Sequence, residues 1–243
     1  MRILRYILSI ACVAMLTTSC VVSRAILYGD ASVDDYRAFE QENIAKGDYT
    51  FRFAELTESE RMLDTMRFEW MHFGRGEMAQ MTIDEAIAPS VDNAAIIIIH
   101  RDTILYERYF GEWSKNTQSQ IFSVSKTITA MLCGVALTEG HIRSVEDRVT
   151  EYLPELKQAN PMFGELKIKH LLDMTAGLDF DENYSFNPFS KMAKLYMGRN
   201  TMRIIERAKF SHKPGERYDY NSLTTAILGA VIERATGMPY AEY

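Results

Sequence analysis

Two β-branched runs followed by a long apolar helix constrain the fold of this chain most. Residues 94–100 contain four consecutive isoleucines and predict a strand that is buried on both faces. Arg101-Asp102 predicts a turn and residues 103–110 a second strand, so the pair is expected to form a β-hairpin. Residues 119–139 then predict a long apolar helix that ends at Gly140, the usual residue after a helix C-terminus.

The start of this helix carries a serine three residues before a lysine. Ser123 and Lys126 share one helix face at this spacing, so their side chains can meet. The helix N-terminus favours a developing alkoxide because it carries partial positive charge. A lysine that has lost its charge can take the serine proton. The pair therefore indicates a nucleophilic serine that needs no histidine, whereas a serine cap beside a solvated lysine is the plainer interpretation.

The rest of the chain reads as helices and loops. Residues 58–72 and 81–88 favour helices before the hairpin, and residues 145–150, 168–174 and 223–235 favour helices after it. Asp179, Asp181 and Glu182 form an acidic cluster that we interpret as a solvated loop rather than a cation or amine site. His170 and His100 are expected to be structural, and Cys133 a small buried hydrophobe.

Composition excludes several classes of protein. The net charge of −6, without a block of basic residues, makes nucleic acid an unsuitable partner. The chain has no His-Glu-x-x-His motif and no paired cysteines, so no metal or other cofactor is predicted. It also lacks a Gly-x-Ser-x-Gly elbow, which leaves an α/β-hydrolase reading without support.

The N-terminus has the pattern of an export signal. A basic start is followed by an apolar run from Tyr6 to Leu16 and by small residues that end at Cys20. A small residue before a cysteine is also typical of a lipoprotein processing site, with plain secretion as the alternative. We therefore expect residues 1–19 to be a signal peptide, Cys20 to be lipidated, and the protein to be anchored to a membrane of the cell envelope, facing the periplasm.

Several motifs in order resemble the serine β-lactamase and penicillin-recognising superfamily. The branch that is most similar is the class C-like one, which includes esterases and 6-aminohexanoate-dimer hydrolases. Its Ser-x-x-Lys motif corresponds to Ser123–Lys126, and its Tyr-x-Ser motif to Tyr220-Asn221-Ser222. Further matching segments are 170–178, Pro214-Gly215, Leu228-Gly229 and 235–237.

The resemblance implies an acyl-enzyme mechanism. Ser123 would attack a carbonyl of an ester, amide or β-lactam, and its backbone N–H would stabilise the oxyanion. Lys126 and Tyr220 would move the proton, and the sequence leaves open which of them is the base. Ser222 would connect this network to the substrate.

The resemblance also implies an α+β fold, an α/β sandwich plus an all-α domain of the β-lactamase/transpeptidase-like type. The family's third motif, Lys-Thr-Gly or His-x-Gly, has no counterpart after Ser222. We therefore expect an incomplete domain that lacks the C-terminal sheet strands, and little hydrolysis by this chain alone. The expected division is a signal at 1–19, a tether at 20–90 and a partial domain at 91–243, with the hairpin and nucleophile helix in 91–140 and a mostly helical region in 141–243. A penicillin-binding or sensor domain, or a non-catalytic envelope lipoprotein, is the alternative.

Overall fold

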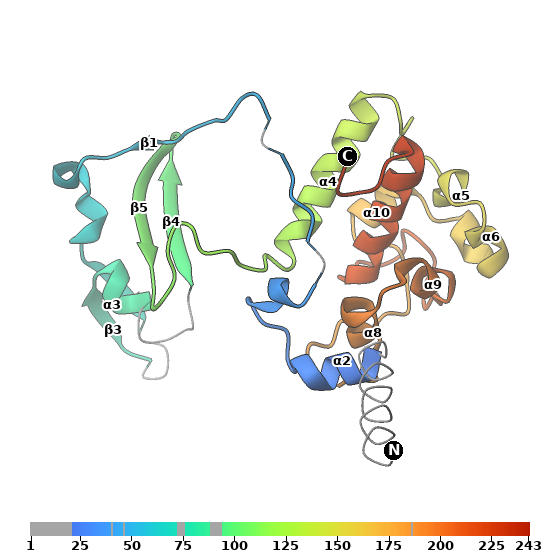
Figure 1. Ribbon diagram of the computed structural model, residues 1–243, viewed down its shortest axis with the longest axis horizontal. Coiled ribbons are helices and arrows are strands. Elements are labelled where there is room, and N and C mark those ends of the chain that lie inside the picture. Colours follow the sequence, from blue (N-terminus) through green and yellow to red (C-terminus); the bar gives the residue numbers. More distant parts are fainter. Residues whose placement is uncertain (1–20, 40, 46, 72–75, 88–93, 186) are drawn as a thin grey trace, which may run out of the picture. The chain divides into compact units, whose positions relative to one another are not determined.

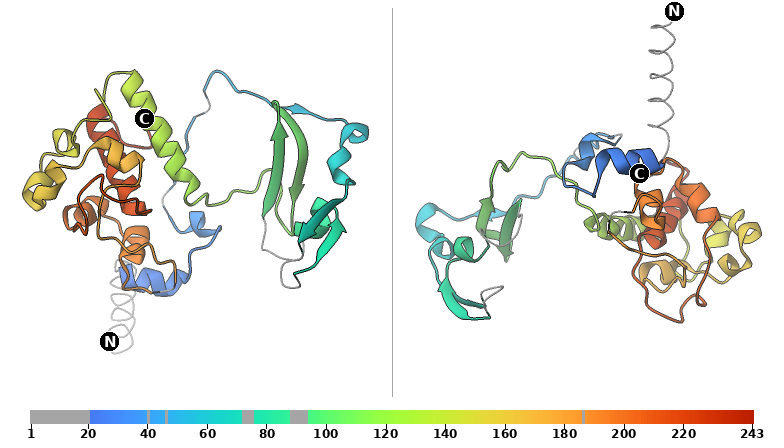
Figure 2. Two further views of the ribbon diagram at one scale, coloured as in Figure 1. Left: turned by 180° about the vertical axis from the view of Figure 1, so that it is seen from behind. Right: turned by 90° about the horizontal axis from the view of Figure 1, so that it is seen from below.

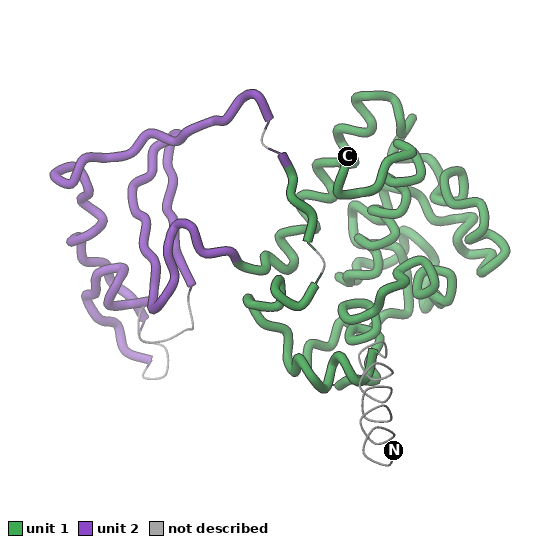
Figure 3. The backbone as a smooth tube through the Cα atoms, viewed as in Figure 1, with its two compact units in different colours: residues 1–44, 119–243 green, residues 45–118 purple. Residues whose placement is uncertain are grey.

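The computed structural model describes residues 21–39, 41–45, 47–71, 76–87, 94–185 and 187–243. The predicted signal peptide and Cys20 lie outside the described residues. The chain divides into two compact units, one of residues 1–44 with 119–243 and the other of residues 45–118 (Figure 3). The predicted hairpin belongs to the second unit and the predicted nucleophile helix to the first.

The second unit contains the predicted hairpin. Strands β4 (Ala95–His100) and β5 (Thr103–Tyr109) pair antiparallel, and the short strand β1 (Ala54–Glu55) pairs parallel with β5 (Figure 1). Arg101 and Asp102 both have positive φ, 48° and 58°, which is the geometry of a two-residue hairpin turn whose twist matches the strands. The hairpin prediction is confirmed.

The predicted burial of β4 on both faces is wrong within the described residues. The strand lies at the edge of its sheet, and Ile97 and Ile99 are 49% and 39% exposed. β-Branched residues favour extended backbone whether or not a partner covers them, so the isoleucine run specified a strand but not its surroundings. An apolar edge strand of this kind offers unpaired backbone groups to another strand.

A predicted helix at 58–72 is also wrong. This stretch forms two 3₁₀ turns, η2 (Glu58–Glu60) and η3 (Met62–Asp64), and then strand β2 (Phe68–Met71), which pairs with β3 (Met78–Met81). The aromatic rings of Phe68 and Trp70 lie edge to face at 6.5 Å on one side of β2, a pairing that suits a strand better than a helix. The short helix predicted at 81–88 is confirmed as α3 (Ile83–Ile87).

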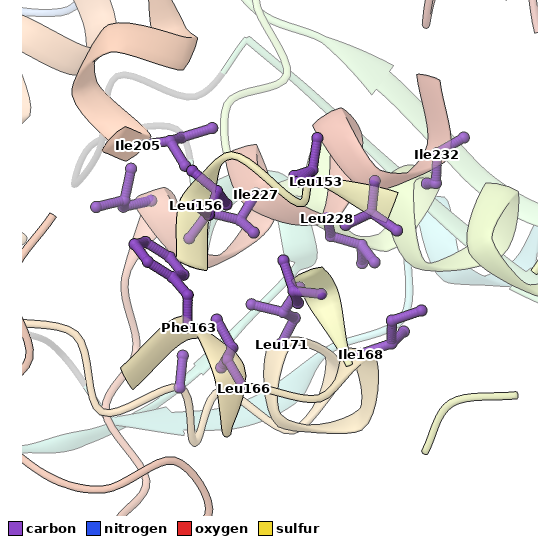
Figure 4. Close-up of a cluster of buried hydrophobic side chains, with 14 of the residues drawn as sticks. Leu153, Leu156, Phe163, Leu166, Ile168, Leu171, Ile205, Ile227, Leu228 and Ile232 are labelled. Atoms are coloured by element: carbon purple, nitrogen blue, oxygen red, sulfur yellow. The ribbon is translucent and has the colours of Figure 1, made fainter. Parts of the chain in front are cut away.

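The first unit is built from helices around one apolar core. Helices α4 (Val124–Thr138) and α10 (Ser222–Thr236) pack against each other, as both views show (Figures 1 and 2), and they confirm the two longest predicted helices. Fully buried side chains from α10 and the segments before it fill the core (Figure 4). The remaining helices are α2 (Val21–Tyr28), α5 (Val149–Tyr152), α6 (Leu156–Ala159), α7 (Ile168–Leu172), α8 (Lys191–Met197) and α9 (Thr201–Glu206), with 3₁₀ turns η1 (Asp35–Arg37) and η4 (Pro161–Gly164).

Two loops of this unit interlock through their backbones. The Ser211 N–H donates to the Gly177 carbonyl at 2.9 Å, and the Asp219 N–H donates to the Met174 carbonyl at 2.8 Å. Gly177 has φ +73°, and a Cβ there would lie 2.4 Å from the His212 carbonyl oxygen, so only glycine fits. This contact holds the loop that follows residue 178 beside the segment that leads into α10.

No helix of the described residues is both long and apolar enough to span a bilayer.

Candidate active site

Ser123 lies at the N-cap position of α4, because the helix begins at Val124 and not at residue 119 as predicted. The residue before it, Phe122, has φ +43°, a left-handed conformation that costs a non-glycine residue about 1–3 kcal/mol. The turn is held by the Lys126 N–H, which donates to the Ser123 carbonyl at 3.0 Å. Within the described residues the Ser123 N–H donates no hydrogen bond, so it is available as the oxyanion donor that the resemblance implies.

Lys126 connects both predicted serines. Its Nζ donates to Ser123 Oγ and to Ser222 Oγ, each at 2.9 Å. Its side chain is only 14% exposed. Ser123 and Ser222 are far apart in the sequence, so the packing of α10 on α4 creates this geometry. The structure therefore brings together three of the four predicted catalytic residues through hydrogen bonds.

Ser222 is placed by a helix cap. The buried side chain of Asn221 accepts hydrogen bonds from the Thr224 N–H at 3.0 Å and from Thr224 Oγ1 at 2.8 Å. An asparagine N-cap satisfies backbone donors that the first helical turn leaves free. Asn221 thus fixes the start of α10 and, with it, the direction of the Ser222 hydroxyl.

Glu182 is a member of the site that the sequence interpretation missed. The Ser222 N–H donates to Glu182 Oε2 at 2.7 Å, and Ser222 Oγ donates to Oε1 at 2.5 Å. Lys126 Nζ lies 4.0 Å from Oε1, and the Glu182 side chain is 11% exposed. The solvated-loop interpretation is therefore wrong for Glu182, although Asp179 and Asp181 are exposed and Asp179 pairs with Lys191.

Two tyrosines lie beside the network in different ways. The Tyr220 ring faces Lys126 Nζ at 4.9 Å from its centroid, a cation–π contact, and its hydroxyl makes no hydrogen bond within the described residues. The Tyr184 hydroxyl donates to Glu182 Oε1 at 2.6 Å and interacts with Ser123. Burial of the hydroxyl, followed by the bond to Glu182, raises the pKa of Tyr184 to about 12, although 62% of the residue is exposed.

The other predicted structural residues lie away from this network. Cys133 is fully buried, and burial raises the pKa of its thiol, so the prediction of a small buried hydrophobe is confirmed. His170 accepts a hydrogen bond at Nδ1 from the Lys167 N–H at 3.2 Å, which confirms a structural role. The described residues contain no group of three or more histidine, cysteine or acidic side chains that could hold a metal ion.

Ser123, Lys126 and Ser222 open into a cavity of about 1030 Å³ within the first unit. This volume is at the upper end of the range for small-molecule sites, about 300–1,000 Å³. Its wall comes from α2 and the residues after it, from α8 and α9, and from one face of α10. A concave site with a serine–lysine pair at its edge has room for a small molecule beside the Ser123 hydroxyl.

The α+β fold and the serine–lysine pair at a helix start define the class: a fold of the β-lactamase/transpeptidase-like type. The Beta-lactamase family matches residues 81–243, and the chain belongs to that family.

Sequence relatives agree with this assignment. The 6-aminohexanoate-dimer hydrolase of Paenarthrobacter ureafaciens is 26% identical over 159 residues, which are 61% of this chain and 39% of that protein. Protein flp of Staphylococcus aureus strain COL is 25% identical over 162 residues, which are 63% of this chain and 32% of that protein. The chain thus spans about a third of the length of the curated relatives it matches.

The fold itself is shared with a solved structure. A Bacillus anthracis protein that is a candidate 6-aminohexanoate-dimer hydrolase superimposes with a TM-score of 0.61 at 23% identity, over 80% of this chain and 50% of that one.

Proposed function

We propose that the protein is a serine hydrolase in which Ser123 forms an acyl-enzyme with an ester, amide or β-lactam carbonyl. The observation that carries the proposal is the pair of 2.9 Å hydrogen bonds from Lys126 Nζ to Ser123 Oγ and Ser222 Oγ. A nucleophile, a candidate base and a residue that orients the base are thereby within direct reach of one another.

The network also suggests how Lys126 becomes a base. A proton can pass from the ammonium group to Ser222 Oγ while the Ser222 proton passes to the Glu182 carboxylate, because these groups form an unbroken chain of hydrogen bonds. The neutral amine then accepts the Ser123 proton as Oγ bonds to the carbonyl carbon. The leaving group receives that proton when the acyl bond to it breaks.

Tyr220 and Tyr184 lie beside this path of proton transfer. The Tyr220 ring lies over Lys126 Nζ, 4.9 Å from the ring centroid, and so makes a cation–π contact beside the proton path. Its hydroxyl is the alternative to Lys126 as the acid toward the leaving group, since the family resemblance implies that the two residues share the proton transfer. The pKa of Tyr184 is raised to about 12, and its hydroxyl donates to Glu182 beside Ser123.

Intact-mass spectrometry during reaction with p-nitrophenyl acetate tests the nucleophile. We expect a transient acetyl adduct that Ser123→Ala abolishes. Ser125→Ala is the matched control, because that hydroxyl bonds the Phe122 carbonyl instead of Lys126, and it should retain the adduct. An adduct of equal amount and rate on the Ser123→Ala variant would contradict the assignment.

The same time course separates the alternatives. An adduct with benzylpenicillin that persists for hours would favour a penicillin-binding or sensor domain, whereas decay of the adduct with product release supports a hydrolase. Because the residues after Ser222 contain no Lys-Thr-Gly or His-x-Gly motif, we propose little hydrolysis by residues 1–243 alone.

We also propose export and a lipid anchor at Cys20, which the N-terminal pattern supports. Labelling with a radioactive fatty acid should mark the wild-type protein and leave Cys20→Ala unmarked. A label that survives this substitution would end the proposal.

A further inference from the structure

Residues 21–39 contact the site although they lie outside the segment that matches the family, residues 81–243. We call these residues the N-terminal strap. Ala25, Gly29, Asp30, Ala31 and Phe39 of the strap line the cavity that contains Ser123. The strap therefore forms part of the wall of the site.

Buried polar contacts fix the strap to α8. Arg24 is 8% exposed, and its Nη1 donates to the Met197 carbonyl at 2.7 Å, while its guanidinium lies 5.8 Å from the centroid of the Phe39 ring. Asp35 is 7% exposed and accepts the Tyr196 hydroxyl proton at 2.8 Å. Burying a polar group is costly unless it is hydrogen-bonded, so these hydrogen bonds hold the strap in a defined position.

The strap also reaches the turn that carries the nucleophile. The Gln120 N–H donates to the Val33 carbonyl at 2.8 Å. The Phe39 ring meets Tyr196 edge to face at 5.2 Å, and Tyr196 in turn stacks on Phe122 at 6.5 Å. Phe122 is the residue with positive φ next to Ser123, so the strap supports the strained turn through one intervening ring.

Part of the cavity lining is apolar. Met192, Leu195, Met202, Ile205, Ala226 and Ala230 contribute to this apolar part of the lining. Among its described lining residues only Asp30, Lys126 and Glu233 carry a charge, and Lys126 is engaged by the two serines. No further cation is available in this lining to receive a carboxylate, so a neutral, apolar group fits best.

We propose that the strap closes an acyl pocket beside Ser123, which selects neutral esters or amides with an extended apolar acyl chain. This inference rests on the proposed function, because Ser123 Oγ must form the bond to the acyl carbon while the bond from that carbon to the leaving oxygen or nitrogen breaks. The leaving group departs with the proton that Lys126 supplies, and the acyl chain stays in the pocket.

Rates of adduct formation with p-nitrophenyl acetate and p-nitrophenyl octanoate test the proposal on the whole chain. Each methylene that enters the pocket should raise the rate about fourfold, so the octanoate should react at least about 50-fold faster even if only half of its additional chain is buried. Equal rates with the two esters, or faster labelling by benzylpenicillin than by the octanoate, would overturn the acyl pocket.

A bulky residue on the strap tests its part in the pocket. Ala31 is exposed and lines the cavity, so Ala31→Trp should lower the ratio of the octanoate rate to the acetate rate at least tenfold. Ala38→Trp, on the same strap but outside the lining, should keep both rates, with melting temperatures checking that all variants fold. An unchanged ratio of the two rates in Ala31→Trp would show that the strap does not shape the pocket. Absence of an adduct with either ester would instead defeat the proposed function, and the inference with it.

Discussion

The first unit of this chain, here the helical unit, and the second unit, here the sheet unit, are organised differently. The continuous apolar core lies in the helical unit, where residues such as Phe163, Leu171 and Ile227 are fully or almost fully buried. In the sheet unit the described buried hydrophobic residues are Ile83 and Tyr106, while Ile97 and Ile99 are exposed. The site residues all belong to the unit that has the core. A rigid core is what holds a serine, a lysine and a second serine within hydrogen-bond distance.

The largest effect should come from the lysine in the helical unit. Lys126→Met removes the proposed base, so the rate of acetyl-adduct formation should fall by about 10²–10⁴-fold, while the melting temperature changes little. Lys169→Met is the control, since Lys169 pairs with Asp173 on the surface. Glu182→Gln should reduce the rate less, because it weakens only the proton path through Ser222. A Lys126→Met variant that is acylated at the wild-type rate would show that Lys126 does not activate the nucleophile in the helical unit.

Core truncation should distinguish the two units by stability. Phe163→Ala leaves a cavity among fully buried neighbours and should lower the free energy of unfolding by about 3–5 kcal/mol. Ile97→Ala, on the exposed edge strand, should cost less than about 1 kcal/mol. Denaturant unfolding followed by circular dichroism measures both, with Phe163→Leu as the conservative control. Similar losses for the two alanine variants would remove the contrast between the units.

The Asn221 cap of α10 tests whether the stability of this helix and the position of Ser222 depend on each other. Asn221→Ala removes the acceptor of two hydrogen bonds from Thr224 and should cost about 1–2 kcal/mol. Because Ser222 is the first residue of α10, acylation should also slow. Asn221→Ser, which keeps a capping oxygen, should restore most of both properties. If the alanine variant keeps full stability and rate, the cap does not position Ser222.

The smallest effect concerns His170 in the helical unit. Burial lowers the pKa of its imidazole below the ordinary value. The unfolded chain then binds a proton more readily, so folding stability is complete above the unfolded pKa and declines as the pH falls below about 6.5 through the folded pKa. Unfolding free energies of the wild type and of His170→Gln at pH 7.5 and pH 5.5 measure this contribution. If the unfolding free energy of His170→Gln depends on pH as strongly as that of the wild type, His170 does not make this contribution.

Local sequence predicted the parts of the site that depend on short spacings. The i, i+3 relation of Ser123 and Lys126 follows from helix geometry, and the strand pattern at 94–110 follows from β-branched residues and the turn at Arg101-Asp102. Ser222 was predicted through the resemblance of residues 220–222, and the structure places it against Lys126.

Glu182 and Tyr184 could not be predicted in the same way. Their positions depend on the backbone pairing of Gly177 with residues 211 and 212 and on the packing of α10, which no local period encodes. Glu182 lies in an acidic stretch that has the composition of a solvated loop. Of the three carboxylates in this stretch, that of Glu182 turns inward. The exposure of β4 escaped prediction for a similar reason, since burial depends on what covers a strand and not on the strand itself.

Tandem mass spectrometry of peptides from protein quenched during reaction with p-nitrophenyl acetate tests the central claim most directly. The account predicts an acetyl group on the peptide that contains Ser123, attached at that hydroxyl and absent once the reaction is complete. An acetyl group that turns over on any other side chain, while Ser123 remains unmodified, would contradict it.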